Sequence, residues 1–189
     1  MVKYALNTVV TCLLFAFSSF AIAASTSLPH LYIETENNAV ITPDGNKKTY
    51  VNASLVLVHG GETEVDTTMR IRGRGNSTWL YGNLYGKKPF RMELDTAQEL
   101  LGLPAARNWI LLANIIDSSL MANAIAFEMA HMLELPFTHT MIPVEVTVNG
   151  EYQGNYMLTE HKEVMENRIA IGADGVLFEM DSHFDQAPL

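Results

Sequence analysis

Short segments in which apolar and polar residues alternate, separated by turn-forming clusters, constrain this chain to a sheet-rich fold. In a strand, every second side chain lies on the same face. From Glu64 onward, one face carries Val65, Thr67, Met69 and Ile71, and the other carries Asp66, Thr68, Arg70, Arg72 and Arg74. Further candidate strands cover residues 31–34, 50–58, 144–148, 152–158, 168–171 and 176–180. Turn signals such as Asn149-Gly150 favour antiparallel pairing of these strands.

One segment has helical rather than strand periodicity. Leu120, Ala124, Phe127 and His131 recur at the spacing of a single helix face, Asp117 supplies a capping side chain, and Pro136 prevents continuation. This pattern predicts a helix over residues 117–133. The predicted fold class is therefore α+β, an antiparallel sheet with one principal helix packed against it.

Residues 1–23 have the pattern of a secretory signal peptide. Lys3 is the only charge, an apolar stretch runs from Ala5 to Phe20, and small residues at Ala21 and Ala23 form a cleavage pattern. The pattern predicts export to the periplasm, the cell surface or the medium, with a mature domain over residues 24–189 and no stable membrane span after cleavage. The alternative is an uncleaved anchor, because the segment approaches the roughly 20 residues that span a bilayer.

Composition narrows the possible partners of the mature domain. Apolar residues make up 48% of the chain and charged residues 17%, which is typical of a packed domain and argues against disorder. The formal net charge of −9 argues against nucleic acid or anionic lipid as a partner. The single cysteine, Cys12, lies in the predicted signal, and the six histidines lack the paired spacing of a zinc site, so we interpret them as structural or surface residues.

Residues 69–79, MRIRGRGNSTW, are the most informative stretch. Arg72, Arg74, Asn76 and Ser77 offer donors suited to an anion such as phosphate, and the two glycines between them allow the backbone to bend and approach a ligand. The alternative interpretation is that the arginines pair with some of the 21 acidic residues and that the glycines form a bulge.

A second basic stretch, KKPFRMEL, occupies residues 87–94. Alternation places Lys88 on the same face as Phe90, Met92 and Leu94, at the mouth of an apolar row, and places Lys87, Arg91 and Glu93 on the opposite face.

Taken in order, these motifs resemble the CotH-type kinases, atypical protein kinases named for spore coat protein H. The resemblance runs over residues 28–181, and its most specific elements are RGRGNSTW at 72–79 and KKPFR at 87–91. Further motifs are WILLAN at 109–114 with Asp117, NAIAFE at 123–128, VEV at 144–146, NGEYQG at 149–154, LTE at 158–160 and NR at 167–168.

The resemblance implies a divergent kinase-like fold whose first lobe is a sheet plus a helix. It implies the use of ATP and Mg²⁺ or Mn²⁺ to phosphorylate serine on a protein substrate. The implied nucleotide- or phosphate-binding residues are Arg72, Arg74, Asn76, Ser77, Lys88, Arg91 and Glu128. By analogy with the lysine–glutamate pair of kinases, Lys88 binds the phosphates and Glu128 on the helix holds Lys88; alternatively, Glu128 is a solvent-facing helix carboxylate.

The sequence leaves the catalytic step open. The segments that would carry the catalytic aspartate and the metal ligands are expected after residue 181, so we expect the chain as given to be inactive or incomplete. Glu179 and Asp181 lie two residues apart and could hold a metal, or could belong to a solvated edge strand. The alternatives are a non-enzymatic binding module for an anionic ligand or partner and a transferase completed by another polypeptide.

Overall fold

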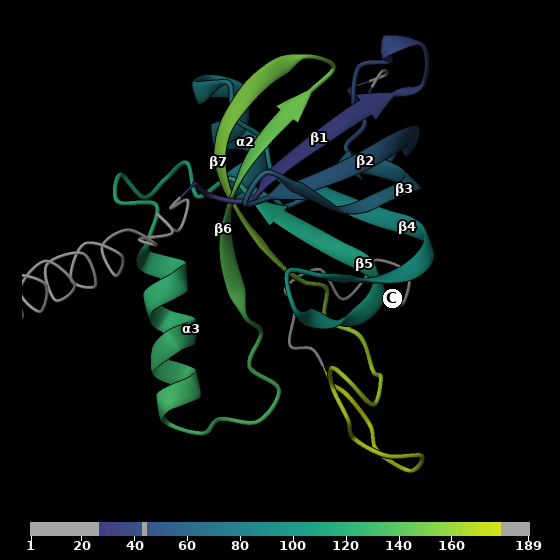
Figure 1. Ribbon diagram of the computed structural model, residues 1–189. Coiled ribbons are helices and arrows are strands. Elements are labelled where there is room, and N and C mark those ends of the chain that lie inside the picture. The colour runs from purple at the N-terminus through teal and green to yellow at the C-terminus, as the bar shows by residue number, and fades with distance from the viewer. Residues whose placement is uncertain (1–26, 43–44, 179–189) are drawn as a thin grey trace, which may run out of the picture.

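The chain forms a closed β-barrel, as the computed structural model in Figure 1 shows. The structure describes residues 27–42 and 45–178. In this part of the chain the barrel strands are β1 (His30–Thr35), β2 (Val51–His59), β3 (Glu62–Gly73), β4 (Phe90–Leu100), β5 (Leu103–Leu112), β6 (Met141–Val148) and β7 (Glu151–Glu160). Their order around the barrel is β1-β2-β3-β4-β5-β7-β6. The prediction of an antiparallel sheet is confirmed for every neighbouring pair except β1 and β6.

The parallel pairing of β1 with β6 closes the barrel. The register runs from His30 opposite Glu145 to Ile33 opposite Val148. At one end the Glu145 amide donates to the Pro29 carbonyl (2.8 Å), and at the other the Asn149 amide donates to the Ile33 carbonyl (2.9 Å). The Asn149 carboxamide oxygen also accepts a hydrogen bond from the Thr35 amide (2.8 Å). The hairpin residue that turns β6 into β7 therefore also fixes the end of β1.

Inward-facing side chains fill the barrel. The alternation predicted for β3 is confirmed, since Met69 and Ile71 are buried in the core. The predicted apolar row on β4 is also confirmed for Phe90, Met92 and Leu94. The core further contains Leu31, Ile33, Leu55, Leu57, Trp109, Leu111, Val144, Val146, Tyr156 and Leu158. Because these side chains close-pack the interior, ligand chemistry is confined to the outer face and the ends of the barrel.

The structure contains a helix that the sequence pattern did not predict. α2 (Ser77–Tyr85) occupies the Tyr/Gly-rich segment that joins β3 to β4. Its start is held by the Asn76 carbonyl, which accepts from the Trp79 and Leu80 amides (both 3.1 Å), and it ends at Gly86, whose φ of 77° is left-handed. The buried indole of Trp79 anchors the helix to the barrel. This tertiary contact compensates for Gly82 and the three aromatic residues of α2, which are weak helix formers.

The predicted principal helix is shorter and differently placed than expected. α3 spans Ala122–Met132, and Asp117 organises the turn before it rather than its first residue, accepting from the Ala122 amide (2.8 Å) and the Ser119 amide (3.0 Å). These hydrogen bonds lower the pKa of Asp117. The expectation that the helix packs against the sheet holds only in part: α3 contacts β6, and Phe127 stacks on His139, but α3 has no buried residue and projects beside β6 (Figure 1). A closed barrel has filled its interior and offers no apolar sheet face to a helix.

Two predicted strands are also absent. Residues 168–171 form no strand, and neither do residues 176–178; residues 179–180 lie outside the described part of the chain. The barrel is closed by β6 and β1, so no free edge is available to these segments despite their apolar residues. The predicted α+β class is thus corrected to a mostly β, mixed barrel with the short α2 and α3 and a 3₁₀ turn, η1 (Glu36–Asn38). A likeness to the first lobe of a kinase stays a prediction.

Replacing Gly73 with alanine should destabilise the protein. A Cβ at Gly73 would lie 2.3 and 2.5 Å from two ring atoms of Trp79, so the buried indole would have to move. Overpacking of this kind costs roughly 1–3 kcal/mol in the free energy of unfolding, measurable by chemical denaturation. In a Trp79→Leu background the same substitution should cost much less, and an equal cost in both backgrounds would show that the contact is unimportant.

Candidate anion-binding site

Cations gather on the outer face of the barrel where β3 ends and β4 begins. Arg72 lies directly opposite Arg91 on the neighbouring strand, and Arg74 follows the end of β3, its amide donating to the Pro89 carbonyl (3.2 Å). Burial, followed by repulsion from Arg72 and Arg91, lowers the pKa of Arg74. Like charges placed opposite each other destabilise a sheet, so packing alone does not explain this arrangement.

Arg74 also lines a cavity of about 230 Å³ on this outer face. Its walls come from β5, from the first half of α3 through Phe127, from the end of β7 through Thr159 and Glu160, and from His161 just after β7. The guanidinium of Arg74 has no hydrogen-bond or ion-pair partner among the residues that the structure describes. A half-buried arginine without a partner beside a cavity is available to a ligand.

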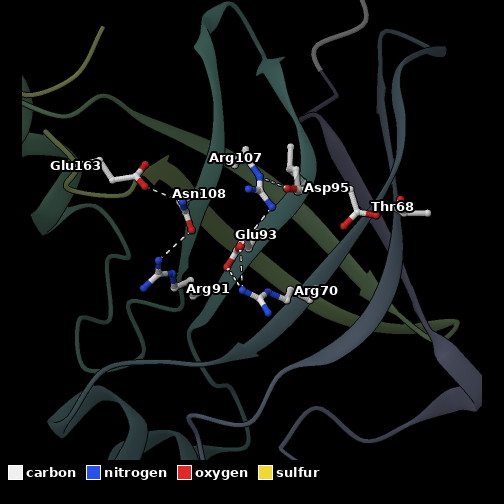
Figure 2. Close-up of polar contacts among 9 residues, drawn as sticks. Thr68, Arg70, Arg91, Glu93, Asp95, Arg107, Asn108 and Glu163 are labelled. Atoms are coloured by element: carbon white, nitrogen blue, oxygen red, sulfur yellow. Dashed lines mark hydrogen bonds and ion pairs between the residues drawn. The ribbon is translucent and has the colours of Figure 1, made fainter. Parts of the chain in front are cut away.

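A polar network holds two further arginines, Arg91 and Arg168, which do not line this cavity themselves; Figure 2 shows its Arg91, Asn108 and Glu163. Arg91 Nη2 donates to Asn108 Oδ1 (2.9 Å), and Asn108 Nδ2 donates to Glu163 Oε1 (2.6 Å). The other oxygen of Glu163 accepts from Arg168 Nη1 (2.8 Å), which also donates to the His161 carbonyl (2.8 Å). The Arg168 side chain is only 1% exposed, and its guanidinium lies over the Trp109 ring, 5.0 Å from the centroid. One carboxylate thus holds the network together.

Several polar atoms in this region are buried without a partner. They are Arg91 Nε, Arg168 Nε, Arg168 Nη2, His161 Nδ1 and Thr159 Oγ1. Leaving a buried polar group unsatisfied costs roughly 1–3 kcal/mol, and more when the group is charged. Burial, followed by repulsion from Arg91 and Arg168, lowers the pKa of His161 to about 4, and Arg74 contributes to this repulsion. His161 therefore lies within electrostatic reach of all three arginines, and Glu163 leaves several of their buried N–H groups without an acceptor.

The structure brings only some of the predicted site residues together. Arg74 and Arg91 belong to the cation cluster, whereas Arg72 turns to the Gly73 carbonyl (3.1 Å) and lies over the Tyr50 ring. Asn76 accepts from Lys47 Nζ (2.7 Å), and Ser77 is exposed at the start of α2.

The alternative of ordinary ion pairing holds for one arginine of β3. Arg70 Nη2 donates to both carboxylate oxygens of Glu93, with both distances 3.0 Å, and Arg107 contacts the same carboxylate (Figure 2). The glycines likewise serve the fold, since Gly73 contacts Trp79 and Gly75 has a φ of +83°. Ion pairing explains Arg70 but leaves Arg74 unexplained.

Lys88 and Glu128 are placed apart from the cation cluster. Lys88 Nζ lies 4.7 Å from the centroid of the Trp79 ring and lines a different pocket, together with Phe90 and Val148. Glu128 is exposed on α3, and no ion pair joins it to Lys88 among the described residues. The lysine–glutamate pairing stays a prediction.

Metal ligation is not observed in the described part of the chain. No group of three His, Cys, Asp or Glu residues that could hold a metal ion occurs within residues 27–42 and 45–178. The candidates Glu179 and Asp181 lie outside the described residues. Within the same ranges, no helix is long and apolar enough to span a membrane.

Two residues of the cluster escaped prediction as site residues. Arg168 was visible only as part of the NR motif, and His161 was interpreted as structural or surface. Both follow β7 in a segment without regular structure, where no periodicity reports which side chains face one another. The adjacent LTE and NR motifs were the available signal.

Comparison with known protein families identifies the family to which the region of the cluster belongs. The family model described as CotH kinase protein matches residues 70–187. The chain belongs to the CotH kinase protein family. The matched region includes Arg74, Arg91, His161 and Arg168, so the whole cluster lies inside the family domain. No curated protein matches the chain.

Replacing Arg74 with methionine should stabilise the protein in the absence of anions. Methionine keeps the unbranched stem and removes a charge that is half-buried, repelled by Arg91 and without a described partner. We expect the free energy of unfolding in low-salt buffer to rise by about 1 kcal/mol, as for other substitutions that relieve strain at a binding site. The control Arg107→Met, at an exposed arginine, should change stability by less than about 0.5 kcal/mol. A loss of stability in Arg74→Met would contradict the interpretation.

Proposed function

We propose that this CotH-family protein binds the phosphate groups of ATP at the cluster of Arg74, Arg91 and Arg168. One observation carries the proposal: buried N–H groups of Arg91 and Arg168 have no acceptor, and the Arg74 guanidinium, which lines the cavity, has no described partner. All three arginines act electrostatically on His161, which lines the same cavity. Guanidinium groups match the planar oxygen pairs of phosphate, and hydrogen bonds between charged partners are about twice as strong as neutral ones.

The shape of the site supports binding of a phosphate tail. The cavity of about 230 Å³ is smaller than the roughly 300–1,000 Å³ of typical small-molecule sites. It suits phosphate groups, with the nucleoside outside the cavity. The apolar Phe127 and Met141 on its walls exclude water and so strengthen the interaction of the anion with Arg74.

Family membership extends the proposal to kinase chemistry. In that form the protein uses ATP with Mg²⁺ or Mn²⁺ to phosphorylate serine on a protein substrate, the metal neutralising charge that develops on the transferred phosphoryl group. The contribution of Arg74, Arg91 and Arg168 is to bind the phosphates, orient them and offset their charge.

The second candidate function is a non-enzymatic module that holds an anionic ligand. It is favoured by Lys88, which lies over Trp79 and lines a pocket other than that of Arg74.

Isothermal titration with ATP tests the binding site. Arg74→Ala should weaken binding tenfold or more, because loss of one hydrogen bond to a charged group costs roughly 1.5–3 kcal/mol. The matched control Arg107→Ala removes an exposed arginine that pairs with Glu93 and should leave the affinity within about twofold. Absence of nucleotide binding by the folded wild type at millimolar ATP would contradict the proposal.

Lys88→Ala separates the two candidate functions. A loss of ATP affinity comparable to that of Arg74→Ala would show that the nucleotide also contacts Lys88, as a kinase-like arrangement requires. Unchanged affinity in Lys88→Ala, with loss in Arg74→Ala, would favour the binding module. Circular dichroism of each variant checks that the fold is intact.

We also propose that the protein is exported, because residues 1–23 carry a signal pattern. Expression of the full chain should yield an extracytoplasmic product whose N-terminus, found by mass spectrometry, lies at Ala24 or within about two residues of it. Intact Met1 in the membrane fraction would instead establish an uncleaved anchor.

A further inference from the structure

His161 is the one titratable ring in the cluster that has a buried, unpartnered nitrogen. Its Nδ1 is inaccessible to water and has no hydrogen-bond partner among the described residues, and the residue lines the cavity beside Arg74. Its carbonyl accepts a hydrogen bond from Arg168 Nη1 (2.8 Å), so the backbone of His161 is fixed within the network.

We propose that His161 contacts the bound phosphate and takes up one proton from solvent as the anion binds. This inference rests on the proposed phosphate site and adds a residue and a pH dependence to it. In the free protein the imidazole is neutral, with one nitrogen protonated. In the complex the imidazole gains a proton, so that both ring nitrogens donate, and Nδ1 donates to a phosphate oxygen.

The charges around His161 determine whether its pKa rises or falls when an anion binds. Cationic groups near the ring are Arg74 from the end of β3, Arg91 from β4, and Arg168 and Lys162 from the segment after β7. The acidic groups of the region are Glu160 at the end of β7 and Glu163, and His139 lines the same cavity. Glu163 is engaged by Arg168 and Asn108, and Glu160 accepts from the Thr140 amide (2.8 Å). Neither carboxylate contacts the ring of His161, so the positive charges prevail.

Burial and these cations lower the pKa of His161 to about 4, although a hydrogen bond with the Lys162 backbone raises it. The ring is therefore neutral above about pH 5 in the free protein. A phosphate among the three arginines reverses the local charge and favours the imidazolium form. The pKa of His161 must therefore rise on binding. By linkage, phosphate affinity must increase as the pH falls toward 4, by about tenfold for each unit by which the pKa rises.

The test is a histidine NMR titration of the full-length protein between pH 4 and 8, with and without saturating ATP. We expect the pKa of His161 to rise by at least about one unit when ATP is present, while the ring signals of His59 at the β2–β3 turn do not respond to ATP. His59 is a matched control because it is exposed and pairs with Glu64 (2.9 Å) outside the cavity.

Calorimetry of variants gives an independent readout. If the pKa of His161 rises by one unit from about 4, the ATP affinity of the wild type should increase about twofold more between pH 8 and pH 5 than that of His161→Gln, and by more for a larger rise. His161→Gln removes the titrating group, while the titration of ATP itself is common to both. His59→Gln should behave like the wild type. If His161→Gln does not fold, the NMR titration of the wild type alone decides.

The possible failures are distinguishable. Absence of ATP binding at every pH would overturn the proposed phosphate site, and this inference with it. ATP binding with the pKa of His161 still at about 4 would overturn only the role of His161. Movement of the His139 pKa in place of that of His161 would overturn it equally, because His139 lines the same cavity.

Discussion

The parallel pairing of β1 with β6 is the constraint on which the rest of the structure depends. It joins the first strand to the last hairpin and removes both sheet edges at once. A closed barrel needs no covering helix, and its own side chains fill its interior. Consequently α3 projects beside β6, and the segment after β7 finds no edge to pair with. That segment instead carries Arg168, which lies over Trp109, and begins with His161, which lines the same cavity as Arg74.

Several arginines of like charge lie close together on the outer face of the barrel, an arrangement that destabilises a folded protein. Arg72 and Arg91 are cross-strand neighbours, and Arg74 and Arg168 lie within reach of the same histidine. Glu163 accepts hydrogen bonds from both Asn108 and Arg168. Nε of Arg91, and Nε and Nη2 of Arg168, are nevertheless buried without an acceptor. Buried charges without partners are costly, so natural proteins retain them where a ligand supplies the missing charge. The unsatisfied donors of Arg91 and Arg168 are the physical basis of the anion site proposed above.

Sequence periodicity correctly predicts which strand residues face the core and where one hairpin turns, because both depend on local sequence. Met69, Ile71, Phe90 and Met92 alternate and face the core as expected, and Asn149-Gly150 forms the expected hairpin turn. Barrel closure has no local signal, because it depends on strands more than a hundred residues apart. α2 was missed since its stability comes from the contact of Trp79 with Gly73 rather than from helix propensity. In the cluster, the RGRG motif identified Arg74, whereas His161 and Arg168 lie in a segment without regular structure and could be placed only by tertiary contacts.

The central claim is that the buried N–H groups of Arg91 and Arg168 donate to a bound phosphate. The side-chain Nε–Hε NMR resonances of the arginines test this claim directly. On titration of isotope-labelled protein with ATP, the Nε–H signals of Arg91 and Arg168 should shift and become protected from exchange with solvent, because they acquire an acceptor. The signals of Arg70 and Arg107, both already paired with Glu93, should stay in place. Shifts confined to Arg70 and Arg107, or no shift in any arginine while ATP binds, would contradict the account.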